Sequence, residues 1–237
     1  MSIGKVQSQI KDQSLNIVHM FGEIGPKKDL KVVGHGLKLT SRLPLALPQQ
    51  MDSWVSRSGL YSLQRTSLTK IDTNFISAFV ERWNLETSSF HMSFGEMSIT
   101  LDDVSCLLHL PIRGVLWSPQ DVTEEVVVEL VVDYLGVSQS EAQRHVRSCM
   151  SSYYNVELLY DLFVHHKAAS IWTYATRAYL LMLVGSIIFA DKTFTLVEAR
   201  YLLLITNLDR CPGYSWGATA LCWIHEYFPT VGKRGEN

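Results

Sequence analysis

Residues Phe90–Gly114, with the sequence FHMSFGEMSITLDDVSCLLHLPIRG, decide which kind of fold this chain forms. Two runs alternate apolar and polar side chains, and their apolar members are Phe90, Met92 and Phe94, then Met97, Ile99 and Leu101. Gly95 and Glu96 stand between the runs, and a Gly-X pair in that place predicts a β-hairpin with a type II′ turn. The apolar face of this hairpin must pack on another element, because an isolated hairpin is barely stable in water.

A capped helix is expected directly after the hairpin. Thr100 precedes Asp103 by three residues, which is the spacing of a capping box. The apolar face of this helix is expected to be Val104, Leu107 and Leu108. Pro111 cannot continue a helix, and the Arg113-Gly114 pair predicts the turn by which the chain leaves it.

Composition favours a folded protein with a large core. Hydrophobic residues make up 47% of the 237 residues and charged residues 19%, which excludes a disordered chain and allows one large domain or two small ones. The net charge of −2 gives no global attraction to nucleic acid or to anionic membranes. The charge is uneven, however, since residues 1–42 carry seven Lys or Arg against three Asp or Glu.

The cysteines and the most apolar segment exclude two classes of protein. The four cysteines are scattered at Cys106, Cys149, Cys211 and Cys222. Cys106 and Cys222 fall on apolar helical faces, and the N-terminus has no signal-peptide pattern, so reduced thiols in the cytosol or nucleus are expected. The apolar run 178–190 is too short for a hydrocarbon layer of roughly 30 Å, so it predicts a buried core helix and no membrane association.

Helical patterns fill most of the remaining chain. One helix, capped by Asp72, is expected to present an apolar face of Phe75, Ile76, Phe79, Val80 and Trp83, and others are expected over 123–135, 138–147, 156–163, 169–189, 196–208 and 216–228. The predicted fold is therefore mainly α, a multi-helix globular domain with one small β-hairpin. Residues 1–50 are expected to form a weakly structured lead-in, 51–230 the helical domain and 231–237 a disordered tail.

The usual enzyme motifs do not emerge from the sequence. Gly185-Ser186 lies inside an apolar run and is not a hydrolase elbow of the G-x-S-x-G type. No Walker loop or dinucleotide fingerprint follows a predicted strand, and no lysine has the setting of a pyridoxal-phosphate site. The sequence therefore predicts no catalytic residue and no cofactor.

Metal sites are also not expected. Gly34-His35-Gly36 lacks the accompanying Asp loop of a metallophosphatase. His165 and His166 are adjacent and point to different sides of a helix. Cys222 and His225 share a helical face with Cys211 nearby, which is one ligand short of a structural zinc site.

A polar and aromatic cluster stands between the last two predicted helices. Its members are Asn207, Asp209 and Arg210, followed by Tyr214, Ser215, Trp216 and Gly217. The cluster is interpreted either as an ion-paired turn that locks two helices together or as an interaction patch of Asp209, Arg210, Tyr214 and Trp216. Aromatic residues and arginine are the side chains that most often dominate binding energy at protein interfaces.

Four blocks of this sequence resemble the plant mobile domain family, also called the aminotransferase-like or MAIN-like domain, which includes proteins labelled "serine/threonine-protein phosphatase 7 long form homolog". They are Gly59-Leu60-Tyr61; 79–114; 177–192; and 200–223. The residues that carry the resemblance include Arg82, Trp83, Phe94, Gly95, Glu96, Asp103, Leu110, Pro111, Gly114, Arg177, Gly185 and Gly217. His109 departs from the pattern, since the family usually has glycine there, and a rebuilt turn is expected at that point.

The resemblance implies a nuclear, transposon-associated plant protein with roles in meristem maintenance and in silencing transposable elements. It implies a nuclear protein partner, of which a phosphatase-like protein is one expected kind. The leading hypothesis is therefore a non-enzymatic interaction module. One alternative is a nucleic-acid-binding remnant of a transposon protein that uses its basic N-terminus; another is a hydrolase in which Glu96, Asp103 and Asp209 converge.

Overall fold

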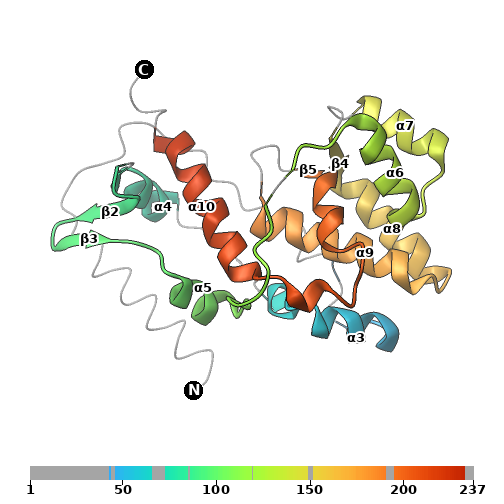
Figure 1. Cartoon of the computed structure of the whole chain (residues 1–237), viewed down its shortest axis with the longest axis horizontal. Helices are drawn as coiled ribbons and strands as arrows, with labels where there is room; N and C mark the ends of the chain where they lie inside the picture. The colour runs from blue at the N-terminus through green and yellow to red at the C-terminus, as the bar shows by residue number, and fades with distance from the viewer. Residues whose placement is uncertain are drawn as a thin grey trace. The chain divides into compact units, whose positions relative to one another are not determined.

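A computed structural model of the chain describes residues 43, 46–65, 73–84, 86–118, 120–148, 152–190 and 195–232, and it describes the backbone alone at 73–75 and 226–232 (Figure 1). The predictions for Asp72 and Cys149, for most of the lead-in and for the C-terminal tail fall outside these residues. The chain divides into two compact units. The larger unit comprises 34–69 and 100–223, and the smaller comprises 1–33, 70–99 and 224–237.

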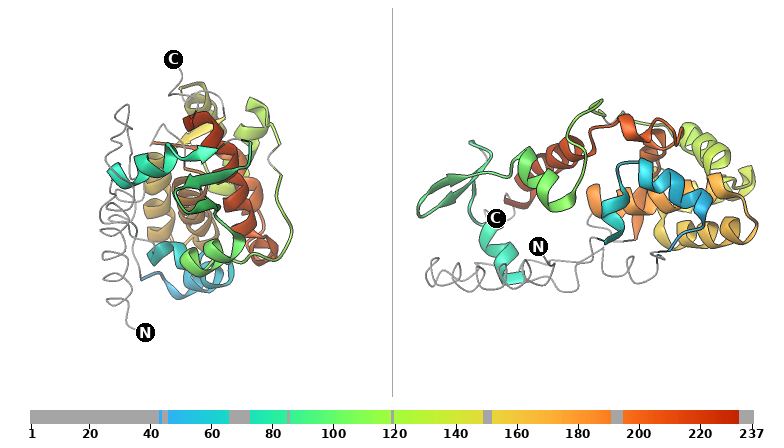
Figure 2. Two further views of the ribbon diagram at one scale, coloured as in Figure 1. Left: turned by 90° about the vertical axis from the view of Figure 1, so that its left-hand side faces the viewer. Right: turned by 90° about the horizontal axis from the view of Figure 1, so that it is seen from below.

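The larger unit is a helical assembly centred on one helix. Its α-helices are α3 (Gln49–Arg57), α5 (Leu101–Leu108), α6 (Glu124–Leu135), α7 (Gln139–Ser148), α8 (Val156–Ala168) and α9 (Trp172–Leu183), and α10 (Trp216–Gly232) begins in it. Four shorter helical segments are η1 (Tyr61–Arg65), η2 (Val184–Ile188), η3 (Ala199–Leu204) and η4 (Cys211–Gly213). α9 packs against α3, α6 and α8 (Figures 1 and 2). Its residues 178–183 are at most 1% exposed, which confirms the predicted core helix.

Several helix ends follow the predicted signals. The Thr100 hydroxyl accepts from the Asp103 amide, and the Asp103 carboxylate accepts from the Thr100 amide at 2.8 Å, so the predicted capping box is confirmed. α6 ends at Gly136 in the left-handed conformation with φ of +68°. The Glu141 amide donates to the Ser138 hydroxyl at the start of α7. Local polar chemistry therefore fixes these boundaries.

The predicted helix over 196–208 is wrong. Residues Leu196–Glu198 form strand β5, which pairs antiparallel with β4 (Tyr153–Asn155) in a second sheet. The chain then continues as the 3-10 helix η3. Tertiary contacts override the helical pattern, because Glu198 accepts a 3.0 Å hydrogen bond from the Tyr153 hydroxyl and pairs with Arg200.

The long helix predicted over 169–189 begins and ends differently. Ala169 and Ser170 form a turn after α8, and Ser170 has a φ of +59°, so α9 starts only at Trp172. The last turn, η2, is a π-helix, in which the Phe189 amide donates to the Val184 carbonyl at 2.9 Å. The predicted helix therefore exists, but it begins three residues later than predicted, and its last turn is a wider π-helix.

Besides the end of α10, the described part of the smaller unit holds a helix and a three-stranded sheet. These elements are α4 (Thr73–Val80), β1 (Trp83–Asn84), β2 (Ser89–Met92) and β3 (Gly95–Met97), in the sheet order β1-β2-β3. Trp83 pairs with Phe90 across the sheet, so it lies on a strand and not on the predicted helical face. The fold is mainly α as predicted, but its β-structure is larger than the one predicted hairpin.

The hairpin exists, and its turn is displaced. Met92 pairs with Gly95, so the turn residues are Ser93 and Phe94 and not Gly95 and Glu96. Trp83, Phe90 and Met92 are buried together with contacts from Phe79 and Ile99. Of the expected apolar face, Phe94 is 66% exposed, Met97 41% and Leu101 38%, because β3 is short and Leu101 already belongs to α5.

Three helical side chains that were expected on apolar faces are instead exposed. Leu107 of α5 is 73% exposed, and Cys106 beside it is exposed too. Cys222 of α10 is exposed, whereas Cys211 is buried. The eight-residue α5 buries only Val104 fully, so most of its surface faces away from the core.

Candidate interaction site

Three of the four motif blocks meet in the larger unit around the indole ring of Trp216. The ring is fully buried. Its Nε1 donates hydrogen bonds to the carbonyl oxygens of Ser58, at 2.9 Å, and Cys211, at 3.1 Å. Ser58 ends α3 and Cys211 begins η4, so one side chain joins the end of α3 to two neighbouring segments that lie about 150 residues later.

Close backbone approach completes this junction. The amide of Gly217 donates to the carbonyl oxygen of Pro111 at 2.8 Å. A Cβ atom at Gly59 would lie 2.9 Å from Cγ of Pro111 and 3.1 Å from Cδ1 of Trp216. Leu110, next to Pro111, is 1% exposed. These motif residues are therefore explained by packing.

A parallel β-bridge joins the segment after α5 to the segment directly before Trp216. Val115 bridges Tyr214, with its amide donating to the Gly213 carbonyl at 2.8 Å and its carbonyl accepting from the Ser215 amide at 3.0 Å. Gly114 has a φ of +133°, and a Cβ there would lie 2.4 Å from the Gly213 oxygen. Only glycine fits this approach without a backbone shift.

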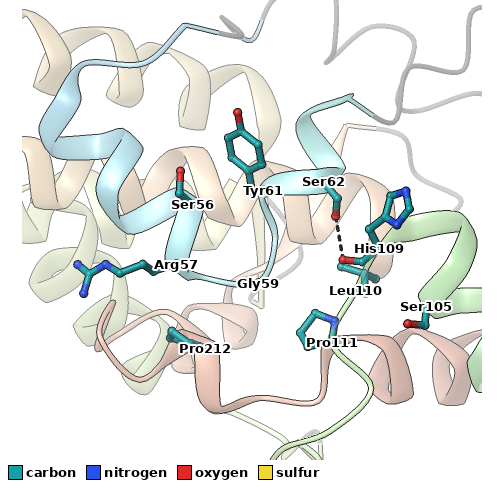
Figure 3. Close-up of a pocket in the computed structure, with 10 residues that line it drawn as sticks. All are labelled: Ser56, Arg57, Gly59, Tyr61, Ser62, Ser105, His109, Leu110, Pro111 and Pro212. Atoms are coloured by element: carbon teal, nitrogen blue, oxygen red, sulfur yellow. Dashed lines mark hydrogen bonds between the residues drawn. The ribbon is translucent and has the colours of Figure 1, made fainter. Parts of the chain in front are cut away.

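A shallow pocket of about 600 Å³ opens beside the junction (Figure 3). Its lining residues are Ser56, Arg57, Gly59, Tyr61, Ser62, Ser105, His109, Leu110, Pro111 and Pro212. Figure 3 shows Arg57 and Pro212 on one side and His109 and Ser105 on the other. The pocket combines a guanidinium, a phenol and an imidazole with proline and leucine surface, which suits contacts with a polypeptide.

Two polar side chains of the pocket, Ser62 and Arg57, donate hydrogen bonds to backbone carbonyl oxygens. The Ser62 hydroxyl donates to the backbone oxygen of His109 at 3.4 Å. Arg57 Nε donates to the Ser53 carbonyl at 3.0 Å. Among the lining residues, these contacts assemble no nucleophile with its base.

The predicted patch of Asp209, Arg210, Tyr214 and Trp216 is only partly at the surface. Asp209 and Arg210 are exposed, Tyr214 is half-buried, and its ring lies edge-on to Trp216 at 5.7 Å. Asp209 pairs with Arg57 at 3.6 Å and not with Arg210. Trp216 belongs to the core, so any binding by this region depends on the other three residues, and that binding stays a prediction.

The carboxylates named for a hydrolase have other contacts. Asp103 caps α5, and Asp209 faces Arg57. Neither lines the pocket. Glu96 is exposed on β3 of the smaller unit, opposite His91. The arrangement of Asp103 and Asp209 therefore gives the hydrolase hypothesis no support.

His109 occupies the position where the resemblance leads one to expect glycine. It ends α5 with φ of +52° and ψ of +35°, which is the left-handed conformation that glycine adopts most easily. Histidine itself therefore adopts the left-handed helix end that suits glycine, and a rebuilt turn relative to the family stays a prediction. The exposed imidazole adds a polar group to the pocket rim.

The motif residues of the smaller unit divide into buried and exposed groups. Arg82 Nη1 donates to the Ala78 carbonyl at 2.7 Å, and the Arg82 carbonyl accepts from the His91 amide at 2.7 Å. These bonds join the end of α4 to β2. Phe94, Gly95 and Glu96 are exposed at the turn and in β3, so packing within the unit does not explain them.

The spacing of possible metal ligands and the length of the helices also bear on the class of site. Among the residues that the structure describes, no group of three or more His, Cys, Asp or Glu is placed to hold a metal ion. None of the described helices is both long and apolar enough to cross a bilayer.

Sequence reasoning singled out half of the residues that line the pocket and missed the other half. Arg57, Ser62 and Ser105 lie on three different segments and share no periodic pattern. The available signals were the motif residues Gly59, Tyr61, Leu110 and Pro111 and the departure at His109, all of which line the pocket. A pocket assembled from separate segments is visible only after the junction around Trp216 has formed.

The fold and site define a mainly helical protein whose motif residues hold distant segments together. A family model described as "Plant mobile domain" matches residues 59–234, so this chain belongs to the plant mobile domain family. No solved structure matches.

Three curated relatives from Arabidopsis thaliana are similar to most of this chain. It is 32% identical to "Protein MAIN-LIKE 1", and the match covers 81% of this chain and 38% of that protein. It is 35% identical to "Protein MAIN-LIKE 2", and that match covers 80% of this chain and 28% of the relative. It is 29% identical to "Protein MAINTENANCE OF MERISTEMS", and the match covers 81% of this chain and 39% of that protein. The chain thus spans less than half the length of the curated relatives it matches.

Proposed function

We propose that this chain is a non-enzymatic protein-interaction module that works in the nucleus. Family membership and the similarity to a protein named for the maintenance of meristems support a role in plant development. The family resemblance adds the silencing of transposable elements as the process in which the module acts. The proposal assigns neither phosphatase nor aminotransferase chemistry to the chain.

The observation that carries this proposal is the exposed apolar surface of the stretch 101–116. Four large apolar side chains are exposed there, with Leu107 at 73%, Val115 at 65%, Leu116 at 56% and Leu101 at 38%. The capping box of α5 and the two backbone hydrogen bonds of Val115 hold this stretch in place. A fixed and exposed apolar surface is a typical protein-binding feature.

The partner that we propose is a nuclear protein of phosphatase-like type. The similarity to a protein named "Serine/threonine-protein phosphatase 7 long form homolog" supports this choice; 29% of residues are identical, and the match covers 74% of this chain and 13% of that protein. A separate phosphatase-like partner would explain why a relative carries a phosphatase name although the pocket described above assembles no nucleophile with its base.

The test is a tagged pull-down from plant nuclei, read by mass spectrometry. The test variant is Leu107→Ala/Leu116→Ala, and the matched control is Leu158→Ala/Val164→Ala, which truncates two exposed side chains of α8. We expect the test variant to recover at least about tenfold less of the phosphatase-like protein than wild type and control, since interface hot spots contribute about 2 kcal/mol or more. Equal recovery by both variants would contradict the proposed surface, and no phosphatase-like protein with wild type would contradict the proposed partner.

The competing proposal is nucleic-acid binding by the basic residues 1–42, seven of which are Lys or Arg against three Asp or Glu. Binding of that kind weakens steeply as salt increases, because bound phosphates release counterions. An electrophoretic shift with duplex DNA at two salt concentrations, with and without residues 1–42, separates this proposal from the interaction module.

A further inference from the structure

The strand β3 forms one edge of the sheet in the smaller unit. It is the last strand in the order β1-β2-β3, and one of its sides pairs with β2 (Figure 1). Among the described residues, no strand pairs with its other side. The three residues of β3 are all exposed. This edge therefore has room for one more strand.

The register shows which backbone groups point to the open side of β3. The His91 amide donates to the Arg82 carbonyl at 2.7 Å, so the backbone groups of His91 point away from β3. His91 lies opposite Glu96 in the pairing of β2 with β3. Since residue pairs of an antiparallel ladder alternate between hydrogen-bonded and non-hydrogen-bonded, His91 and Glu96 form a non-hydrogen-bonded pair. The N–H and C=O of Glu96 therefore point to the open edge, where they have no hydrogen-bond partner among the described residues.

The side chains of β3 give the two faces of this edge different chemistry. Gly95 and Met97 lie opposite Met92 and Phe90, whose side chains are buried, so these positions belong to the core face. Met97 is nevertheless 41% exposed, and a Cβ at Gly95 would have no atom within 4 Å. Glu96 is exposed on the other face. An added strand would meet space and apolar surface on one face and a carboxylate on the other.

The charge of Glu96 decides which kind of strand can be added. Glu96 takes part in none of the salt bridges of the described residues. Two copies of the chain that paired antiparallel through this residue would place two carboxylates directly opposite each other, which is destabilising. A charge on a short edge strand resists self-association in this way. A lysine or arginine opposite Glu96 would instead form a cross-strand ion pair.

We propose that β3 binds an extended segment of another protein as an added strand, and that this segment carries a lysine or arginine between two apolar residues. The basic residue takes both hydrogen bonds of the Glu96 backbone and pairs with its carboxylate. Its two neighbours lie on the core face, at Gly95 and Met97. In such strand addition, backbone hydrogen bonds give affinity and alternate side chains give specificity. The inference rests on the proposed function in that the chain binds proteins, but it uses a surface separate from 101–116.

The test is an NMR titration of the intact chain that follows the backbone amide signal of Glu96. Both peptide probes read Ser-Gly-Thr-Val-X-Val-Thr-Gly-Ser, with X as lysine in one and as glutamate in the other. We expect the signal to shift and saturate with the lysine peptide, at an affinity about fivefold to tenfold higher than with the glutamate peptide, because the pair opposite Glu96 changes from unlike to like charge. No saturating shift with the lysine peptide, or equal affinities, would overturn the proposal. A signal that moves with protein concentration alone would also overturn it, since a second copy would then occupy the edge.

Two charge variants show whether the edge itself makes the choice. Glu96→Lys reverses the charge, and we expect it to prefer the glutamate peptide by about the same factor. Glu86→Lys is the matched control, since it makes the same change in the exposed turn between β1 and β2, and it should keep the wild-type preference. A reversed preference in both variants would show that net charge decides and would overturn the proposal. If Glu96→Lys does not fold, the comparison of the two peptides on the wild-type chain decides.

A third variant separates this inference from the surface of the proposed function. Leu107→Ala/Leu116→Ala alters the stretch 101–116, which belongs to the larger unit. We expect it to bind the lysine peptide as wild type does, even if it loses the phosphatase-like protein in the pull-down. Loss of peptide binding in this variant would place the peptide on the stretch 101–116 and overturn the assignment to β3.

Discussion

The indole nitrogen of Trp216 donates a 2.9 Å hydrogen bond to the backbone oxygen of Ser58, a residue 158 positions earlier in the chain. The same nitrogen also donates to Cys211. The Ser58 carbonyl lies at the C-terminal end of α3, where backbone oxygens lack intrahelical partners, whereas the Cys211 carbonyl begins η4 and also accepts from the Tyr214 amide at 3.3 Å. The indole therefore satisfies the orphan acceptor at the end of α3 and adds a second hydrogen bond to η4, which explains why this aromatic residue lies inside the junction.

Replacing Trp216 should destabilise the larger unit. Trp216→Phe removes both hydrogen bonds and part of a fully buried ring, so we expect the free energy of unfolding to fall by about 2–4 kcal/mol. The measurement is urea unfolding followed by circular dichroism. Trp117→Phe is the control, since Trp117 is only half-buried and makes ring contacts with Phe189 and Tyr201. Equal losses in both variants would show that ring size, and not the indole hydrogen bonds, decides the effect.

Gly185 should tolerate no side chain, because β5 packs directly on the π-helical turn. A Cβ at Gly185 would lie 2.2 Å from Cγ1 of Val197. Gly185→Ala should therefore cost about 1–3 kcal/mol of unfolding free energy through overpacking, although alanine favours helix. In the double variant Gly185→Ala/Val197→Ala, the free energies of the single variants should not add, since the second change removes the clash. Additive losses would contradict this contact.

The sequence predicted best the features that depend on neighbouring residues. The Thr100–Asp103 box, the glycine end of α6 and the Ser138–Glu141 pair were all found, because capping depends on residues within three or four positions. The apolar run of α9 was found because a buried helix is apolar on all sides.

The features that were missed depend on distant contacts. Leu196–Glu198 carries a helical pattern but pairs with a strand about forty residues earlier, a preference that is set by tertiary context. The pocket beside Trp216 combines segments with no common period. The exposure of Phe94 could not be read from alternation, since alternation cannot say where a strand ends.

His109 should be a point of stored backbone strain. A non-glycine residue in the left-handed region costs roughly 1 kcal/mol, so His109→Gly is expected to raise the free energy of unfolding by about 0.5–1 kcal/mol. Ser105→Gly, inside α5, is the control and should lower it by about 0.5–1 kcal/mol. Thermal unfolding of the two variants gives the comparison. A His109→Gly protein that is less stable than wild type would show that the imidazole makes a contact worth more than the strain.

His166 should make the stability of the larger unit depend on pH. Its buried Nε2 lies 2.8 Å from the Leu135 carbonyl at the end of α6, and its Nδ1 has no partner among the described residues. Burial lowers the pKa of His166 below its ordinary value. A group whose pKa is lowered on folding stabilises the protein above its unfolded pKa, which is about 6.5 for histidine, and this stability is lost as the pH falls through the folded pKa.

We therefore expect the wild-type free energy of unfolding to decrease as the pH is lowered from 7 toward 5. Burial also lowers the pKa of His145, so His166→Gln should reduce this slope without abolishing it. His165→Gln changes the exposed neighbour and should keep the wild-type slope. Denaturant unfolding at several pH values measures all three proteins, and His166→Gln with an unchanged slope would mean that the buried imidazole does not control it. A reduced slope would instead show that neutral His166, hydrogen-bonded to the end of α6, is what the folded state requires.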